Sequence, residues 1–404
     1  MHVMLLGASG FIGTEVLHAL RAAGHQVTAC ARSVAGKPQL EGVDWLALDL
    51  VRPLDAQTLQ WPQRIDVLVN AAGVLDTAAT MLAVHEQGLL AVAARCRAQG
   101  ARVIQLSALG ADAAADTVFL RSKGQADAAL LAADARTLVI RPSLVLGAAG
   151  QSSQWLLKVA AWPWAPLLGG QARLQPLAVE DLAAFVLRAV DEPALCGVYE
   201  LGGPEQTLPE LLQGLRARAG WRPAWYSRLS LPGWCLALCG ERLATLARLA
   251  QRNNCLTAGA QQTQLPAPLQ APRWPALGGQ LAVSQARQWL LLALLCVWLG
   301  TAWACLGPGR AWGEQLLLEA GFTARLVPWL VIAGAVLDAC LGIGLLIARW
   351  RRRVLQAQIL LVLGYTLMIS WLLPHYWYDP LAAVLKNLPI LAASGWLLSV
   401  EPKR

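Results

Sequence analysis

The sequence predicts an α/β domain with a doubly wound parallel sheet, followed by an all-α bundle of four transmembrane helices. Three observations support this fold class: a glycine-rich turn near the N-terminus, alternating strand and helix patterns after it, and four long apolar runs beyond about residue 285. Of the 404 residues, 56% are hydrophobic and 14% are charged, whereas roughly a quarter are charged in soluble domains. This composition argues against a disordered chain and against a wholly soluble one.

The glycine-rich turn lies between a short buried strand, residues 2–6, and a helical pattern that continues to Ala23. Its glycines follow the spacing G-x-x-G-x-x-G, which allows a tight turn and a close approach of the backbone to a pyrophosphate at the helix N-terminus. The alternative is a chance glycine turn without a ligand. We expect dinucleotide contacts from this segment, at Gly7, Ser9, Gly10, Phe11, Ile12 and Gly13.

The end of the second expected strand, 26–30, bears on the choice of cofactor. NAD-binding domains place an acidic residue near this point to accept a hydrogen bond from the ribose 2′-hydroxyl. No acidic residue occurs between Glu15 and Glu41, and Arg32 follows the strand instead. A guanidinium suits a 2′-phosphate, so NADP(H) is favoured over NAD(H).

Three further strand patterns each end in polar or small residues. They cover 45–48 before Asp49-Leu50, 66–69 before Asn70-Ala71-Ala72-Gly73, and 102–106 before Ser107. Strands that alternate with helices predict a parallel sheet covered on both faces, which is the Rossmann arrangement.

Taken together, these motifs resemble the extended and atypical short-chain dehydrogenase/reductase superfamily. The nearest branch contains NmrA-like sensors and the NAD(P)-binding accessory subunit of respiratory complex I. Segments 140–147, 176–183 and 197–204 resemble its C-terminal, substrate-side part, so the match covers about residues 1–220. The resemblance implies further cofactor contacts at Arg32, Asp49, Leu50, Ala71, Ala72, Gly73, Lys123 and Pro142, and a reactive end at Ser107 and Lys123.

Members of this superfamily that reduce carbonyls use Tyr-x-x-x-Lys, in which the tyrosine is the general acid and base. Here the segment reads Phe119-Leu120-Arg121-Ser122-Lys123, and the first 198 residues contain no tyrosine. Losing a positioned general acid removes roughly 10²–10⁴ in rate. Ketone reduction is therefore disfavoured, whereas acceptors that take protons from solvent, such as quinones, suffer less.

Apolar runs at 288–306, 326–348, 354–373 and 381–400 have the length of membrane-spanning helices. The alternative is four buried helices of a soluble core. Arg349 and Arg351 to Arg353 crowd one junction, which the positive-inside rule places in the cytoplasm together with the N-terminal domain and the C-terminus. This part, with Asp379-Pro380 and residues 386–389, resembles DoxX-like four-helix membrane proteins, and we expect a bacterial inner-membrane protein.

The predicted organisation has four parts. These are an NAD(P)-binding domain at 1–225 with a substrate-side lobe at 150–225, an interfacial amphipathic helix at 226–250, a linker at 251–287, and the membrane domain at 288–404. Segment 226–250 could equally pack on the soluble domain. In the lobe, Trp155, Trp162 and Trp164 either cap an apolar ligand or belong to its core.

Two functions fit these features. The first is a membrane-anchored NAD(P)H-binding oxidoreductase that acts on a membrane-soluble acceptor, a quinone or a lipid. The alternative is a non-catalytic, NADPH-dependent sensor or assembly factor for a membrane complex. A third possibility is that the membrane bundle alone carries the function. The scattered basic residues do not indicate nucleic-acid binding, and His375 with Asp379 supplies too few ligands for a metal site.

Overall fold

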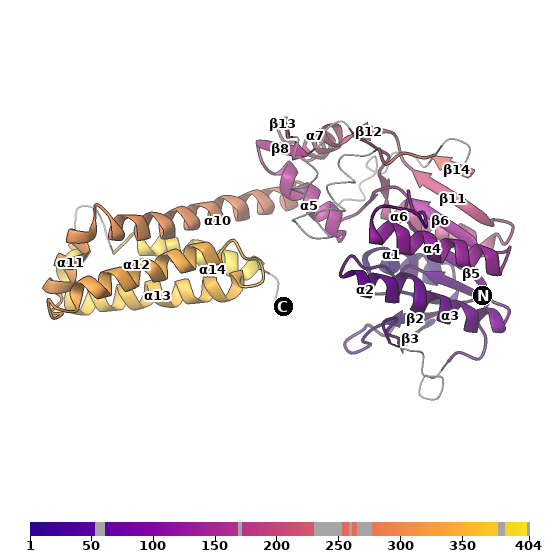
Figure 1. Ribbon diagram of the computed structural model, residues 1–404, viewed down its shortest axis with the longest axis horizontal. Coiled ribbons are helices and arrows are strands. Elements are labelled where there is room, and N and C mark those ends of the chain that lie inside the picture. Colours follow the sequence, from indigo (N-terminus) through magenta and orange to yellow (C-terminus); the bar gives the residue numbers. More distant parts are fainter. Residues whose placement is uncertain are drawn as a thin grey trace. The chain divides into compact units, whose positions relative to one another are not determined.

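The computed structural model describes residues 1–52, 61–168, 172–229, 253–257, 261–264, 277–378 and 384–401. The chain divides into two compact units, Met1–Leu281 and Ala282–Arg404 (Figure 1).

The first unit is built on an eight-stranded sheet with the order β14-β11-β6-β5-β4-β1-β2-β3, and every pairing in it is parallel. Its strands are β1 (His2–Leu6), β2 (Gln26–Ala31), β3 (Val43–Ala47), β4 (Val67–Asn70), β5 (Arg102–Leu106), β6 (Leu138–Pro142), β11 (Gly197–Gly202) and β14 (Gln261–Gln264). The order reverses between β1 and β4, which is the switch point where doubly wound sheets bind ligands. The predicted fold class is confirmed.

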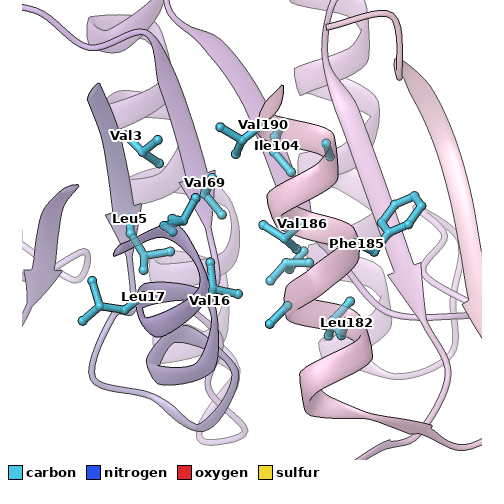
Figure 2. Close-up of a cluster of buried hydrophobic side chains, with 14 of the residues drawn as sticks. Val3, Leu5, Val16, Leu17, Val69, Ile104, Leu182, Phe185, Val186 and Val190 are labelled. Carbon is cyan, nitrogen blue, oxygen red and sulfur yellow. The ribbon is translucent and has the colours of Figure 1, made fainter. Parts of the chain in front are cut away.

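Both faces of this sheet are buried, because alternate side chains of each strand enter different cores. On one face, Val3 and Leu5 of β1 pack with α1 (Phe11–Ala22) and α6 (Val179–Asp191). Figure 2 shows Val16 of α1 and Val186 of α6 in this cluster. On the other face, β1 packs with α3 (Gly88–Ala98) and α4 (Val118–Ala133). Helix α2 (Ala78–Leu82) and a π-helical turn (Ala83–Gln87) precede α3.

A smaller lobe of the first unit has its own core. It contains α5 (Gln151–Ala160), α7 (Leu208–Arg218), and the strand pairs β7 (Val145–Leu146) with β10 (Leu177–Ala178), β8 (Trp164–Leu168) with β13 (Trp225–Leu229), and β9 (Arg173–Leu174) with β12 (Gln206–Thr207). Leu156, Leu212 and Leu215 are buried here together with Leu277 and Leu281.

The second unit is helical. Its elements are α10 (Leu277–Leu306, which begins in the first unit), α11 (Arg310–Glu319), α12 (Val327–Gly344), α13 (Arg351–Leu372), a 3₁₀ turn (Pro374–Tyr378) and α14 (Asn387–Val400). Within the described residues, α10, α12 and α13 are long and apolar enough to cross a membrane, and α14 is a shorter apolar helix. Leu294, Leu341, Leu355 and Leu397 join these helices in one core.

The structure departs from the sequence prediction between 225 and 287. Residues 225–229 form β13, so the predicted amphipathic helix does not begin at 226, and residues 230–250 lie outside the described part. Within the predicted linker, residues 261–264 form β14 and residues 277–287 belong to α10. That helix starts early because Leu277 and Leu281, one turn apart, are buried in the lobe.

Candidate nucleotide-binding and active site

The glycine turn lies against the end of β4. Gly7 follows β1 with φ +71°, a left-handed conformation that favours glycine. A Cβ at Gly7 would lie 2.8 Å from the Cα of Ala72, and one at Gly13 would overlap the carbonyl oxygen of Gly7. Side chains at these two positions would therefore push α1 away from β1 and β4.

The N-terminus of α1 is suited to an anion. Its N-cap is Gly10, and within this described segment no side chain caps the helix and no acidic residue occupies its first turn. The first N–H groups and the positive end of the helix dipole thus face the turn without a competing carboxylate. Ser9 and Gly10 are exposed. These features fit the pyrophosphate of a dinucleotide.

The predicted side chains of this turn do not all face outward. Ile12 packs against the core of α1 and α6. The ring of Phe11 lies so close to Gly147 that a Cβ there would come within 2.8 Å of it. Phe11 thus packs against the loop that enters the lobe.

Arg32 and Asp49 follow neighbouring strands. Arg32 is exposed directly after β2, at the position where a 2′-phosphate would be read. Asp49 is half-buried, accepts a hydrogen bond from the amide of Val51 at 3.1 Å and lies 3.6 Å from Arg52. The backbone of Leu50 contacts Gly88, where a Cβ would overlap its carbonyl.

Asn70 shapes the turn after β4. Its side chain is fully buried and donates a hydrogen bond to Oε1 of Gln105 at 2.8 Å. Its Oδ1 accepts from the amide of Ala72 at 3.0 Å. These bonds fix Ala71 and Ala72 beside Gly7.

Lys123 is buried on α4 at the end of β5. Its Nζ donates to the carbonyl of Leu106 at 3.0 Å and lies 5.7 Å from the centroid of the Phe119 ring. A Cβ on Gly73 would be 3.7 Å from this Nζ. Burial lowers the pKa of Lys123 to about 8, although Asp127 acts in the opposite direction. The ammonium therefore lies beside the turn after β4 and loses its proton more readily than a surface lysine.

Ser107 is held by a pair that the sequence analysis did not identify. Its hydroxyl donates to Oδ2 of Asp127 at 2.7 Å, and Arg141 contacts the same oxygen at 3.0 Å. Burial raises the pKa of Asp127, while Ser107 and Arg141 oppose this shift. The hydroxyl hydrogen of Ser107 thus points to Asp127, which leaves the serine oxygen as an acceptor. The available signal was spacing, since Asp127 is one helical turn after Lys123.

His85 is a second residue that sequence reasoning missed. It lies in the π-helical turn before α3, and such turns are frequent at functional sites. Nε2 accepts from the amide of Val74 at 3.0 Å, and Nδ1 is 3.0 Å from Oγ of Ser122. The His85 ring meets the Phe119 ring edge to face, with centroids 5.5 Å apart.

The predicted residues thus form two groups at the carboxyl edge of the sheet. Gly7, Gly13, Ala71 and Ala72 make one, and Lys123 with Phe119 makes the other, with Gly73 next to both. Pro142 lies at the end of β6, where its carbonyl accepts from the amide of Leu109 at 3.0 Å.

The Rossmann sheet and the glycine turn between β1 and α1 agree with the resemblance to the short-chain dehydrogenase/reductase superfamily. Residues 1–209 match the RmlD substrate binding domain family, and the chain belongs to it. Residues 295–395 match the DoxX-like family. Both resemblances drawn from the sequence are thereby confirmed.

Curated relatives come from bacteria and from mitochondria. Ceramide reductase of Caulobacter vibrioides is 30% identical over 240 residues, which cover 57% of this chain and 74% of the relative. Subunit 9 of the NADH dehydrogenase [ubiquinone] 1 alpha subcomplex from Arabidopsis thaliana mitochondria is 28% identical over 217 residues, covering 50% of this chain and 53% of the relative. Among solved structures, the human epimerase family protein SDR39U1 with NADPH aligns at a TM-score of 0.49 and 22% identity, covering 70% of this chain and 99% of the other.

Proposed function

We propose that the protein is a membrane-anchored, NAD(P)H-dependent oxidoreductase whose acceptor is a membrane-soluble molecule, a quinone or a lipid. The observation that carries this proposal is the buried Lys123, held by the carbonyl of Leu106 beside Gly73 and Phe119, in a chain that also has a DoxX-like domain. The relative named ceramide reductase supports a lipid acceptor.

Different residues of the site bind the cofactor and contact the acceptor. The glycine turn and the N-terminus of α1 bind the pyrophosphate, and Lys123 holds the nicotinamide ribose. When bound there, the cofactor would supply a hydride, and with one proton from water this would reduce the acceptor by two electrons. Ser107, oriented by Asp127 and Arg141, accepts a hydrogen bond at the reactive end.

The test uses the full-length protein in lipid nanodiscs, with NADPH oxidation followed after addition of ubiquinone or a ketone-bearing ceramide. We expect Lys123→Ala to lower the rate at least tenfold. Arg188→Ala, which changes an exposed pair with Glu192 on α6, is the matched control and should retain the wild-type rate. An unchanged rate in Lys123→Ala would contradict the assignment.

Arg32 supports a preference for NADPH over NADH. A charged hydrogen bond to a 2′-phosphate contributes about 1.5–3 kcal/mol, or roughly a ten- to hundredfold change in affinity. A titration followed by tryptophan fluorescence should show that Arg32→Ala weakens NADPH binding by this factor and leaves NADH binding unchanged. Equal binding of both nucleotides to the wild-type protein would refute the preference.

Phe119 favours a second candidate, a non-catalytic NADPH-dependent sensor or assembly factor for a membrane complex. A phenyl ring cannot donate the proton that a tyrosine would supply at this position. The relatives named as subunits of NADH dehydrogenase are consistent with this role. It predicts nucleotide binding without turnover and a membrane complex that co-purifies with the protein.

Phe119→Tyr separates the two candidates. The ring already packs against His85 and lies 5.7 Å from Nζ of Lys123, so the variant places a phenol beside the lysine. If the remaining groups are catalytic, carbonyl reduction should rise by about 10²–10⁴. A variant that binds NADPH tightly but reduces neither ketone nor quinone would favour the sensor.

We also propose a location in the bacterial inner membrane. In this arrangement residues 1–225 act on the nucleotide, and 288–404 hold the chain in the bilayer with the N-terminal domain and the C-terminus in the cytoplasm. Arg349 and Arg351 to Arg353 support this orientation. Protease added outside intact spheroplasts should leave the first unit uncut, and cleavage there would reverse the orientation.

A further inference from the structure

We propose that the small lobe of the first unit has a surface that contacts anionic lipid headgroups. This tryptophan surface consists of Trp155, Trp164 and Trp225 together with the cations Lys158, Arg218 and Arg222. It is independent of the nucleotide chemistry proposed above.

The three indole side chains are unusually exposed. Trp225 is 78% exposed, Trp164 54% and Trp155 45%. The other described tryptophans of the first unit are all half-buried, so every exposed tryptophan described in this unit lies on this lobe. Leaving large apolar side chains in water is unfavourable, and a group of them marks a contact surface.

The backbone places two of these side chains together. Strands β8 and β13 are parallel, and Trp225 is the register partner of Trp164. Partners in a parallel pair project from the same face of the ribbon, so the two indoles lie side by side. Trp155 lies on α5, the helix just before β8. Leu156 and Leu157 of the same helix are buried in the core of the lobe.

The charge around these tryptophans is positive. Residues 151–168 contain Lys158 and no acidic residue, and residues 208–229 contain four arginines and only Glu210. Lys158, Arg218 and Arg222 are exposed. Arg216, by contrast, is buried and donates to the backbone carbonyl of Arg222 at 2.7 Å. Tryptophan with lysine and arginine is typical of a surface that meets anionic membranes.

The lobe is also the part of the first unit that leads into the membrane domain. Leu277 and Leu281 at the start of α10 are buried in the lobe core, and α10 continues to Leu306 as a candidate membrane span. The chain from Leu281 to the apolar run at residue 288 is about 10 Å long as a helix. Only this short segment joins the lobe to the first candidate span, and the positive charge of the lobe suits anionic headgroups, whereas a second copy would bring like charges together.

The experiment places p-benzoylphenylalanine at Trp225 or Trp164 of the full-length protein. The control position is Val51, which is 50% exposed and lies outside the lobe. After irradiation in nanodiscs of phosphatidylcholine with phosphatidylglycerol, we expect at least fivefold more lipid adduct at 225 and 164 than at 51. Equal adducts at all three positions, or crosslinks to a second copy or another protein, would overturn the proposal.

A charge reversal tests the choice of lipid. Arg222→Glu combined with Lys158→Glu should remove the extra adduct that phosphatidylglycerol gives over phosphatidylcholine alone, while NADPH affinity stays unchanged. Arg64→Glu, at an 81% exposed side chain outside the lobe, is the control and should keep the extra adduct. If the double variant keeps it too, the contact is not with anionic headgroups.

Discussion

His85 illustrates how burial fixes a protonation state next to the candidate site. Because Nε2 accepts a hydrogen bond from the amide of Val74, the ring proton is on Nδ1 and is donated to Ser122. Burial, and then the charge of Lys123, lower the pKa of His85 to about 3. The ring is therefore neutral at physiological pH and connects the turn after β4 with α4.

This state makes folding stability depend on pH. The unfolded chain binds the imidazole proton near pH 6.5, whereas the folded chain does so only near pH 3. The contribution of neutral His85 to the free energy of unfolding is therefore fully present above pH 6.5 and is lost as the pH falls. At pH 5 the loss is about 2 kcal/mol. His85→Gln should lack this pH-dependent contribution. In thermal unfolding scans, the stability difference between wild type and His85→Gln should therefore be smaller at pH 5 than at pH 7.

The exposed His18 on α1 provides the control for this prediction. His18→Gln should keep the full pH dependence of the wild type. If His85→Gln keeps it too, the histidine is not held neutral by its surroundings.

Residues differ in how far the sequence reveals them. Gly7, Gly13, Lys123 and Phe119 occur in motifs, so their places near the sheet edge could be predicted. His85 and Asp127 could not, because their roles depend on the packing of neighbouring helices. Val74 and Ser122 reach His85 from the turn after β4 and from α4, and only the folded chain brings the three together.

At the scale of single elements, two helical glycines should respond in opposite ways to alanine. In α1, a Cβ at Gly13 would overlap the carbonyl of Gly7, so Gly13→Ala must displace the helix from the turn. In α7, nothing lies within 4 Å of a Cβ at Gly214. Alanine there should stabilise the first unit by about 0.5–1 kcal/mol through helix propensity.

Urea unfolding and NADPH titration of both variants measure this contrast. Gly13→Ala should cost about 1–3 kcal/mol and weaken NADPH binding, whereas Gly214→Ala should bind as the wild type does. Normal NADPH affinity in Gly13→Ala would mean that the turn is not the pyrophosphate site.

The elements that could be predicted are those with a strong apolar pattern. Strands β1, β2, β4, β5 and β6 each contain consecutive buried side chains, and the long helices contain extended apolar runs. Strand β14 consists only of Gln261, Gln262, Thr263 and Gln264, which have no apolar signal. Its pairing with β11 comes from backbone hydrogen bonds, which the hydrophobic periodicity of the sequence does not predict.

At the scale of the whole molecule, each unit has its own hydrophobic core, and the membrane unit also contains a buried ion-pair network. Glu401 is 5% exposed at the end of α14 and accepts hydrogen bonds from Arg287 of α10 at 2.6 Å and from Arg351 of α13 at 3.5 Å. Arg352 donates to the backbone carbonyls of Leu398 and Glu401. Arg351 and Arg352, two of the arginines that set the predicted orientation, therefore also link α13 to α14, and Arg287 adds α10 to the same network.

Removing the charge of the Glu401 carboxylate should show how much this network contributes to the stability of the membrane unit. Glu401→Gln keeps the shape but leaves two partly buried guanidinium groups without their counter-ion, which should cost about 3 kcal/mol. Glu314→Gln, which breaks an exposed i,i+4 pair with Arg310, should cost about 0.5 kcal/mol or less. Thermal unfolding of both variants in neutral detergent, followed by helical circular dichroism, should separate them by several degrees. Anionic lipid should restore part of the loss in Glu401→Gln, because headgroup phosphates can replace the carboxylate. If the two variants unfold together, the arginines are solvated and do not hold the helices.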